Sequence, residues 1–188
     1  MSVIFINAAF RDDSRTNKLA QHYMSRFDKD VKTIDLGTNP VKPLDKELLK
    51  IYNKAVAEHD FSNRLFEPAI DFANATEIVI AAPFWNFGLP GVLSNYLEII
   101  CSQGVTFDID DAGTYYSCCK AKKLTFITTA GGRIPANNHA FGFIKDLAEM
   151  FWKIPEVKCY KADGLDIYGT DVDRELKEVC DQMDFQEV

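Results

Sequence analysis

Apolar and polar positions along the chain follow a pattern that predicts five strands separated by helices. Short apolar or alternating runs, each bounded by polar or turn-forming residues, lie at residues 2–6, 31–36, 78–82, 124–129 and 157–162. The run at 78–82 is continuously apolar, as in a central parallel strand that is buried on both faces. The run at 31–36 alternates apolar with polar residues, which is typical of an exposed or edge strand.

Between and after these runs, apolar residues recur at the period of amphipathic helices. The helical patterns cover residues 19–27, 48–56, 65–73, 92–100, 141–151 and 172–183. The patterns at 48–56 and 65–73 follow one another without a strand, so we expect a pair of helices that covers the sheet. Pro90 suits the first turn of the helix that follows it, and Asp171 or Asp173 could cap the last helix.

Strands that alternate with helices predict a doubly wound α/β fold, with a parallel sheet, right-handed crossovers and helices on both faces. A chain of 188 residues is long enough for one hydrophobic core and short for two, so we expect one domain at 1–188. Such sheets bind ligands outside the carboxyl ends of their strands. The loops at 10–17, 83–90 and 130–134 are therefore the candidate ligand-binding loops.

The first loop enters a helix through Ser14, Arg15, Thr16 and Asn17. Hydroxyls, a guanidinium and free backbone N–H groups at a helix N-terminus are groups that bind anions. Ser14, Thr16 or Asn17 would also serve as an ordinary helix cap, and both interpretations stay open. Neither GxGxxG nor GxxxxGK[ST] occurs, so the sequence predicts no dinucleotide fingerprint and no triphosphate-binding P-loop.

The second loop places Phe84, Trp85 and Phe87 directly after a buried strand, where a connection is normally polar. Aromatic side chains at this position indicate a flat ligand. Asn86 can offer both a donor and an acceptor to a ring edge, and Gly88 would let the backbone approach closely. The alternative is that the aromatic residues pack into the core or a subunit interface, which leaves Asn86 unexplained.

The third loop follows the fourth strand and contains Thr129, Ala130, Gly131, Gly132 and Arg133. Its backbone N–H groups could bind the pyrimidine carbonyls of a flavin, and Arg133 could offset the charge of the reduced ring. Paired glycines at a strand end also form simple turns. For Arg133 we favour the simpler interpretation, a solvated side chain.

Composition narrows the range of partners. A net charge of -7 and a pI of about 5.0 argue against nucleic acid and anionic membranes, because both need clustered Lys and Arg. No apolar run approaches the roughly 20 residues that span a bilayer. The five cysteines form no CxxC pair and no secretory leader is present, which indicates a reduced, cytoplasmic protein.

Histidine and cysteine spacing gives no sign of metal chemistry. The three histidines are scattered, and none pairs with a cysteine at metal-ligand spacing, so we expect no metal site. Cys118 and Cys119 are neighbours, and adjacent cysteines rarely form a relaxed disulfide. We interpret them as small buried or loop residues rather than as a redox centre.

The segment at 81–90, AAPFWNFGLP, resembles the most specific motif of the FMN-dependent NADH azoreductase and quinone reductase family. The likeness covers nearly the whole chain and continues at Leu93, Tyr96, 104–107 (GVTF), Lys122, Lys123, 129–132 (TAGG) and 162–165 (ADGL). The resemblance implies a flavodoxin-like fold, with a five-stranded parallel sheet in the order 2-1-3-4-5.

The resemblance also implies a cofactor site. By position, the phosphate of FMN falls on Ser14, Arg15 and Thr16. The binding site for the isoalloxazine ring falls on Phe84, Trp85, Asn86 and Phe87. The site is completed by Thr129, Ala130, Gly131 and Gly132. No catalytic side chain is implied, because the flavin carries the chemistry.

The implied activity is a two-electron, ping-pong oxidoreductase on a homodimer, with each flavin near the subunit boundary. NADH or NADPH reduces FMN, and a quinone or an azo compound then oxidises it. No ribose-reading acid or 2′-phosphate arginine can be placed in the sequence, so the choice between NADH and NADPH stays open.

Two departures from the family pattern affect the cofactor site. Ala8 and Ala9 stand where relatives usually carry serines, and Ala130 replaces the arginine of an Arg-Gly-Gly motif. Each hydrogen bond lost from a charged phosphate costs roughly 1.5–3 kcal/mol, so we expect weaker FMN binding. Because of Ala8 and Ala9, a second interpretation stays open: a divergent dimer with the same fold that binds no cofactor.

Two other functions on this topology are less well supported. A one-electron flavodoxin-type carrier would normally show a Gly-containing, Ser/Thr-rich phosphate loop, which is absent from 10–17. A phosphorylated receiver domain needs an aspartate at the end of the third strand. That strand ends in Ala81, Ala82 and Pro83, which offer no carboxylate.

Overall fold

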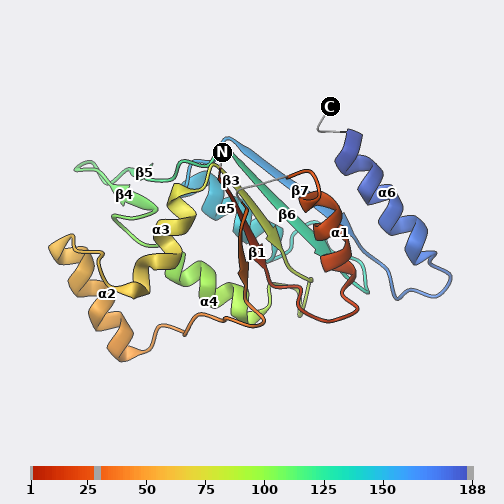
Figure 1. Ribbon diagram of the computed structural model, residues 1–188, viewed down its shortest axis with the longest axis horizontal. Helices are drawn as coiled ribbons and strands as arrows, with labels where there is room; N and C mark the ends of the chain where they lie inside the picture. The colour runs from red at the N-terminus through yellow and green to blue at the C-terminus, as the bar shows by residue number, and fades with distance from the viewer. Residues whose placement is uncertain (1, 28–30, 186–188) are drawn as a thin grey trace.

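A five-stranded parallel sheet forms the centre of the computed structural model, which describes residues 2–27 and 31–185. Its strands are β1 (Val3–Asn7), β2 (Val31–Asp35), β3 (Glu77–Ala81), β6 (Lys123–Thr129) and β7 (Glu156–Ala162). They lie in the order β2-β1-β3-β6-β7, with every neighbouring pair parallel (Figure 1). Counted within the sheet alone, this order is 2-1-3-4-5, which confirms the prediction.

The hydrophobic pattern explains the position of each strand. Every residue of β1 and of β3 is buried, as expected for the central strands, whereas β2 keeps exposed positions and lies at an edge. In register, Asn7 pairs with Ala81, and Ala81 pairs with Ile127. The loops that follow β1, β3 and β6 therefore leave the same edge of the sheet side by side.

Helices cover both faces of the sheet, as predicted. One face packs against α1 (Arg15–Met24) and α6 (Val172–Phe185), and the other packs against α3 (Glu67–Asn74), α4 (Gly91–Ile100) and α5 (Phe141–Met150). Figure 1 shows α1 and α6 on one side of the strands and α3 and α4 on the other. Alternate side chains of each strand thus enter two separate cores.

We expected two consecutive helices to cover the sheet, and this prediction is wrong for the first of them. Only Ala55 of α2 (Lys46–Glu58) is buried, and the helix lies outside the sheet, packed through Tyr52 against Phe66, with ring centroids 5.7 Å apart (Figure 1). The pattern at 65–73 divides into a 3-10 turn, η1 (Arg64–Phe66), and α3. Pro68 explains the division, because proline suits the first turn of a helix.

An antiparallel hairpin, formed by β4 (Phe107–Ile109) and β5 (Tyr115–Ser117), was not predicted. Strands of three residues are too short to show an alternating pattern. Phe107 anchors the hairpin by stacking on Phe151, with a centroid distance of 4.4 Å. Within the described ranges, no helix has the length and apolar character needed to cross a membrane.

Candidate functional site

The three predicted loops enclose a cleft of about 320 Å³ at the carboxyl edge of the sheet. Most predicted site residues line it: Ser14, Arg15, Thr16, Phe84, Trp85, Thr129, Ala130 and Gly131. Asn86, Phe87 and Gly132 do not contribute to its walls. Because β1, β3 and β6 are neighbours in the sheet, residues more than 100 positions apart in the chain meet in one cleft.

The first wall is the start of α1. The Ser14 hydroxyl accepts a hydrogen bond of 3.1 Å from the Asn17 amide, so Ser14 is the helix cap. Arg15 and Thr16 occupy the first turn, where backbone N–H groups have no acceptor within the helix. Capping and anion binding are therefore compatible. Ser14 can still donate its hydroxyl proton to an anion, and the backbone amides of Arg15 and Thr16 remain available as donors.

A buried pair of hydroxyls joins the first wall to the third. Thr16 is only 1% exposed, and its Oγ1 lies 2.7 Å from Oγ1 of Thr129 at the end of β6. One of these hydroxyls donates to the other, and the acceptor keeps its own proton. The pair can thus supply one further hydrogen bond to a ligand.

Four charged side chains of the cleft form two ion pairs. Arg15 Nη1 lies 2.6 Å from Oδ1 of Asp166, and Arg11 Nη2 lies 3.5 Å from Oδ1 of Asp13. Asp166 was missed by the sequence analysis, which considered the loops after β1, β3 and β6 but not the loop after β7. The signal was available, because the carboxyl ends of all parallel strands meet at one edge.

The second wall is a strained two-residue turn. Trp85 and Gly88 exchange two backbone hydrogen bonds of 3.2 and 2.8 Å, and the residues between them, Asn86 and Phe87, have φ values of +50° and +62°. These features match a type I′ turn. Left-handed backbone costs a residue such as Phe about 1–2 kcal/mol.

Gly88 does not supply the left-handed backbone of this turn, and its expected role in close approach to a ligand stays a prediction. Its φ is not positive, and a Cβ atom there would meet only the carbonyl oxygen of His139, at an ordinary 3.8 Å. The close turn depends instead on Asn86 and Phe87. Asparagine tolerates the left-handed region because of its short polar side chain, whereas phenylalanine has no such compensation.

The aromatic residues of this loop divide between core and surface. Phe84 is half-buried and packs against the core, so the core-packing alternative holds for this residue. Trp85 is 40% exposed and lines the cleft, while Phe87 is 68% exposed and contacts Phe84 edge-on at 6.2 Å. Trp85 is therefore the large flat surface that the cleft offers to a ligand.

The third wall follows β6 and is held by the segment after β7. The carbonyls of Ala130, Gly131 and Gly132 accept hydrogen bonds from the amides of Leu165, Asp166 and Gly164. Among the described residues, no hydrogen bond engages the amides of Gly131 and Gly132, which leaves both free for a ligand. A Cβ atom at Gly131 would lie 2.0 Å from Asp166 Oδ2, so a larger residue there would displace the Asp166 side chain.

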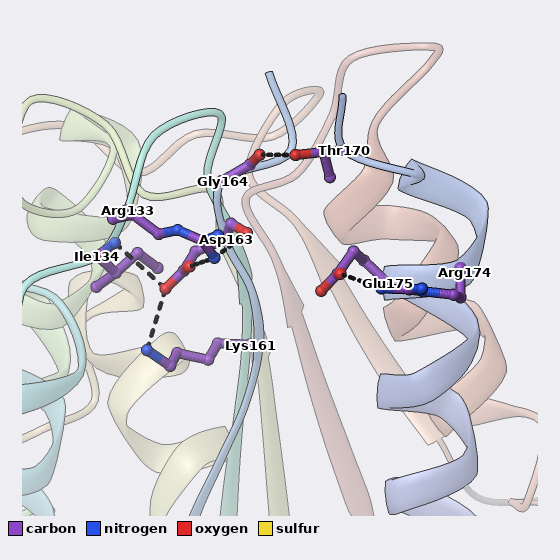
Figure 2. Close-up of polar contacts among 8 residues, drawn as sticks. All are labelled: Arg133, Ile134, Lys161, Asp163, Gly164, Thr170, Arg174 and Glu175. Carbon is purple, nitrogen blue, oxygen red and sulfur yellow. Dashed lines mark hydrogen bonds and ion pairs between the residues drawn. The ribbon is translucent and has the colours of Figure 1, made fainter. Parts of the chain in front are cut away.

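Asp163 organises the segment that supports this wall (Figure 2). Its carboxylate accepts from Arg133 Nη1 at 3.0 Å, Lys161 Nζ at 3.1 Å and the Ile134 amide at 3.3 Å. Burial works to raise the pKa of this carboxyl, but the hydrogen bonds from Arg133 and Lys161 outweigh it and hold the pKa below its ordinary value. Asp163 thus ties the end of β7 to the end of the third loop.

Arg133 lies outside the cleft walls, is 70% exposed and points to Asp163. This position matches the simpler interpretation of a largely solvated side chain, although the guanidinium is paired. Cys118 and Cys119 are free and half-buried, and burial raises the pKa of the Cys119 thiol to about 12. Such a thiol is protonated at neutral pH and is a poor nucleophile.

The sheet order and the position of the cleft define a doubly wound α/β protein with a ligand site at the carboxyl edge of its sheet. A family profile described as a flavodoxin-like fold matches residues 1–184. The chain therefore belongs to this flavodoxin-like family, which confirms the resemblance seen in the sequence.

Similar proteins include the FMN-dependent NADH:quinone oxidoreductase 2 of Clostridium acetobutylicum, which is 27% identical over 96% of this chain and 94% of its own length. The FMN-dependent NADH:quinone oxidoreductase of Lachnoclostridium phytofermentans is 28% identical over 94% of this chain and 92% of its own length.

Solved structures of similar fold include an FMN-dependent NADH-azoreductase from Bacillus anthracis in complex with FMN. It has a TM-score of 0.79 and 20% identity, over 99% of both chains. An NAD(P)H:quinone oxidoreductase from Methanothermobacter marburgensis has a TM-score of 0.71 and 14% identity, over 97% of both chains. At these identities the likeness shows a common fold.

Proposed function

We propose that this chain is an FMN-dependent NAD(P)H oxidoreductase that reduces quinones and azo compounds by a two-electron, ping-pong mechanism. One observation carries the proposal: a single cleft joins anion-binding groups at the start of α1 to the exposed face of Trp85. FMN has the matching construction, with a phosphate at one end and a planar ring at the other. Relatives along nearly the whole chain are named as FMN-dependent oxidoreductases.

The residues present fit FMN at both ends. Ser14 and the amides of Arg15 and Thr16 would hold the phosphate, while Trp85 and the free Gly131 amide would contact the ring. We retain Asn86, Phe87 and Gly132 as the rim of the site, since they flank the residues that line it. Bound FMN supplies the electron transfer, and the protein supplies orientation, hydrogen bonds and exclusion of water.

We further propose that residues 1–188 form one domain of a cytoplasmic homodimer. Support comes from a groove of about 570 Å³ bordered by α2, α4 and α5 and lined by Tyr52, Leu97 and Phe143, among others. Phe143 and Met150 also leave much of their side chains exposed on α5. Exposed apolar side chains beside a groove are typical of interaction sites, and a partner here would lie on the α4 and α5 side of the sheet.

A visible absorption spectrum tests the cofactor and the reaction together. We expect purified protein supplemented with FMN to retain about one FMN per chain after gel filtration, to be bleached by NADH or NADPH, and to regain its colour with benzoquinone. An FMN-loaded sample that reacts with neither nucleotide would contradict the proposal. A stable neutral semiquinone during reductive titration would indicate a one-electron carrier instead.

A cofactor-free dimer is the second candidate, and Ala8 and Ala9 favour it. Both residues line the cleft and are buried, so the end of β1 offers methyl groups where relatives usually place hydroxyls. Equilibrium dialysis against FMN distinguishes the two candidates. Retention of FMN at micromolar concentration excludes the cofactor-free scaffold.

A further inference from the structure

The phosphate end of the cleft has no unpaired cationic side chain among its described lining residues. Arg15 is paired with Asp166, and Arg11 is paired with Asp13, so the four charges cancel. A phosphate monoester carries a charge of roughly -1.5 to -2 at neutral pH. Sites that select such an anion usually present cations or N–H groups without an internal carboxylate partner.

Asp166 is held in place by the third wall of the cleft. Its amide donates to the Gly131 carbonyl at 2.9 Å, and its side chain lies against Gly131, where an added Cβ atom would displace it. Its carboxylate reaches across to Arg15 on the first wall. The charge of Asp166 therefore stands at the junction of the two walls proposed to contact the cofactor.

We infer that the Asp166 carboxylate competes with the cofactor phosphate for the Arg15 guanidinium, and so lowers the preference of the cleft for FMN over unphosphorylated riboflavin. The inference rests on the proposed function, which supplies the flavin. To bind a phosphate through its side chain, Arg15 must exchange or share its 2.6 Å contact with Asp166. The phosphate must also approach a carboxylate of like charge, which raises the free energy of the complex.

Other features of the cleft act in the same direction. Ala8 and Ala9 remove hydroxyl donors from the phosphate end, whereas Trp85 and the Gly131 amide, at the ring end, recognise parts common to FMN and riboflavin. The ring end thus contributes equally to both ligands. The difference in affinity between FMN and riboflavin therefore arises at the phosphate end, where Asp166 contributes the only electrostatic competition for Arg15 among the described lining residues.

The test measures the dissociation constants of FMN and riboflavin by quenching of flavin fluorescence, for the wild-type chain and for Asp166→Asn. We expect Asp166→Asn to bind FMN roughly fivefold to tenfold more tightly, because it frees Arg15 and removes a like charge from a partly exposed site. Riboflavin affinity should change less than twofold. High salt should reduce the gain in FMN affinity, since the effect is electrostatic.

Asp181→Asn is the matched control. Asp181 also pairs with a cation, Lys177 at 2.7 Å, but it lies on α6 outside the cleft. This variant removes the same charge and a similar ion pair, and we expect it to leave both affinities unchanged. Asp166→Ser serves as a second variant. Because the Asp166 side chain is 69% exposed, we expect both Asp166→Asn and Asp166→Ser to fold.

Three results would overturn the inference. Weaker FMN binding in Asp166→Asn would mean that Asp166 positions Arg15 for the phosphate rather than competing with it. An unchanged FMN-to-riboflavin ratio, or an equal gain for both ligands, would remove Asp166 as the source of discrimination. If neither flavin binds to any variant, the proposed function fails as well, whereas an unchanged ratio with clear flavin binding leaves the proposed function intact.

Discussion

The two ends of the cleft are constructed in different ways. At the phosphate end, most polar groups already have partners within the chain: Ser14 caps α1, Thr16 binds Thr129, and Arg15 binds Asp166. At the ring end, Trp85 is exposed and stands at the start of a turn that keeps Phe87 in a left-handed conformation. The difference indicates that recognition of the ring is strong and recognition of the phosphate is adjustable.

The largest expected effect is at the ring end. We predict that Trp85→Ala weakens binding of both FMN and riboflavin roughly 10- to 100-fold, because it removes the main apolar surface against which the ring would be buried. Fluorescence titration of both flavins measures the effect. Tyr168→Ala is the control, since Tyr168 is fully exposed and lies outside the cleft. A loss of affinity for FMN alone, with riboflavin binding unchanged, would contradict the distinction between the ring end and the phosphate end of the cleft.

The next effect concerns Asp163, which supports the third wall of the cleft. This wall borders both the ring end and the phosphate end. We predict that Asp163→Asn lowers the free energy of unfolding by about 1–2 kcal/mol at pH 7, because Arg133 and Lys161 lose a charged acceptor. Urea denaturation at a series of pH values measures this loss.

The pH dependence of that loss has a defined sign. The folded-state pKa of Asp163 is lowered, so its contribution to stability is present above the unfolded-state value of about 3.9 and disappears as the pH falls through the folded value. The difference between wild type and Asp163→Asn should therefore shrink below about pH 4. A difference that stays constant down to pH 3 would show that packing, not charge, is responsible.

A smaller effect is expected at Arg15. We predict that Arg15→Gln weakens FMN binding roughly threefold to tenfold and leaves riboflavin binding unchanged, because of the two ligands only FMN has a phosphate that the guanidinium could bind. In an Asp166→Asn background the same change should cost more, since Arg15 there has no competing partner. Titrations of the two single variants and the double variant give this coupling. Equal losses in both backgrounds would contradict it.

The smallest effect concerns the strained turn. We predict that Phe87→Gly raises the free energy of unfolding by roughly 0.5–1 kcal/mol, because glycine adopts φ of +62° without a Cβ clash. Phe87→Ala removes the same exposed ring but keeps the clash, so it should give no gain. Chemical denaturation compares the two variants. Equal stabilities would mean that the turn carries no strain at this residue.

Much of this arrangement was predictable from sequence because the fold follows from alternating patterns. A continuous apolar run marked β3 as central, and the loops that follow adjacent parallel strands necessarily meet. Three loops and most of their lining residues followed from that rule alone. The resemblance at 81–90 then added the flavin as the expected ligand.

The features that sequence reasoning missed depend on tertiary packing. The pairing of Arg15 with Asp166 joins residues 151 positions apart, and no local pattern signals it. Glycine is the usual residue for left-handed backbone, yet in the turn at 85–88 Asn86 and Phe87 adopt it, which the sequence pattern did not indicate. The displacement of α2 from the sheet follows from the contact of Tyr52 with Phe66, which periodicity cannot specify.

The hydroxyl pair of Thr16 and Thr129 has a consequence for motion in the cleft. It links the first turn of α1 to the end of β6 through a buried hydrogen bond, so we expect these two walls to move together. The segment that enters the turn at 85–88 is bonded to β6 by the Phe84 amide, which donates to the Thr129 carbonyl at 2.9 Å. The Phe87 carbonyl also accepts a hydrogen bond from the His139 amide at 3.3 Å, so the turn is attached to the segment before α5 rather than to α1, and we expect it to move independently of the two threonine-linked walls.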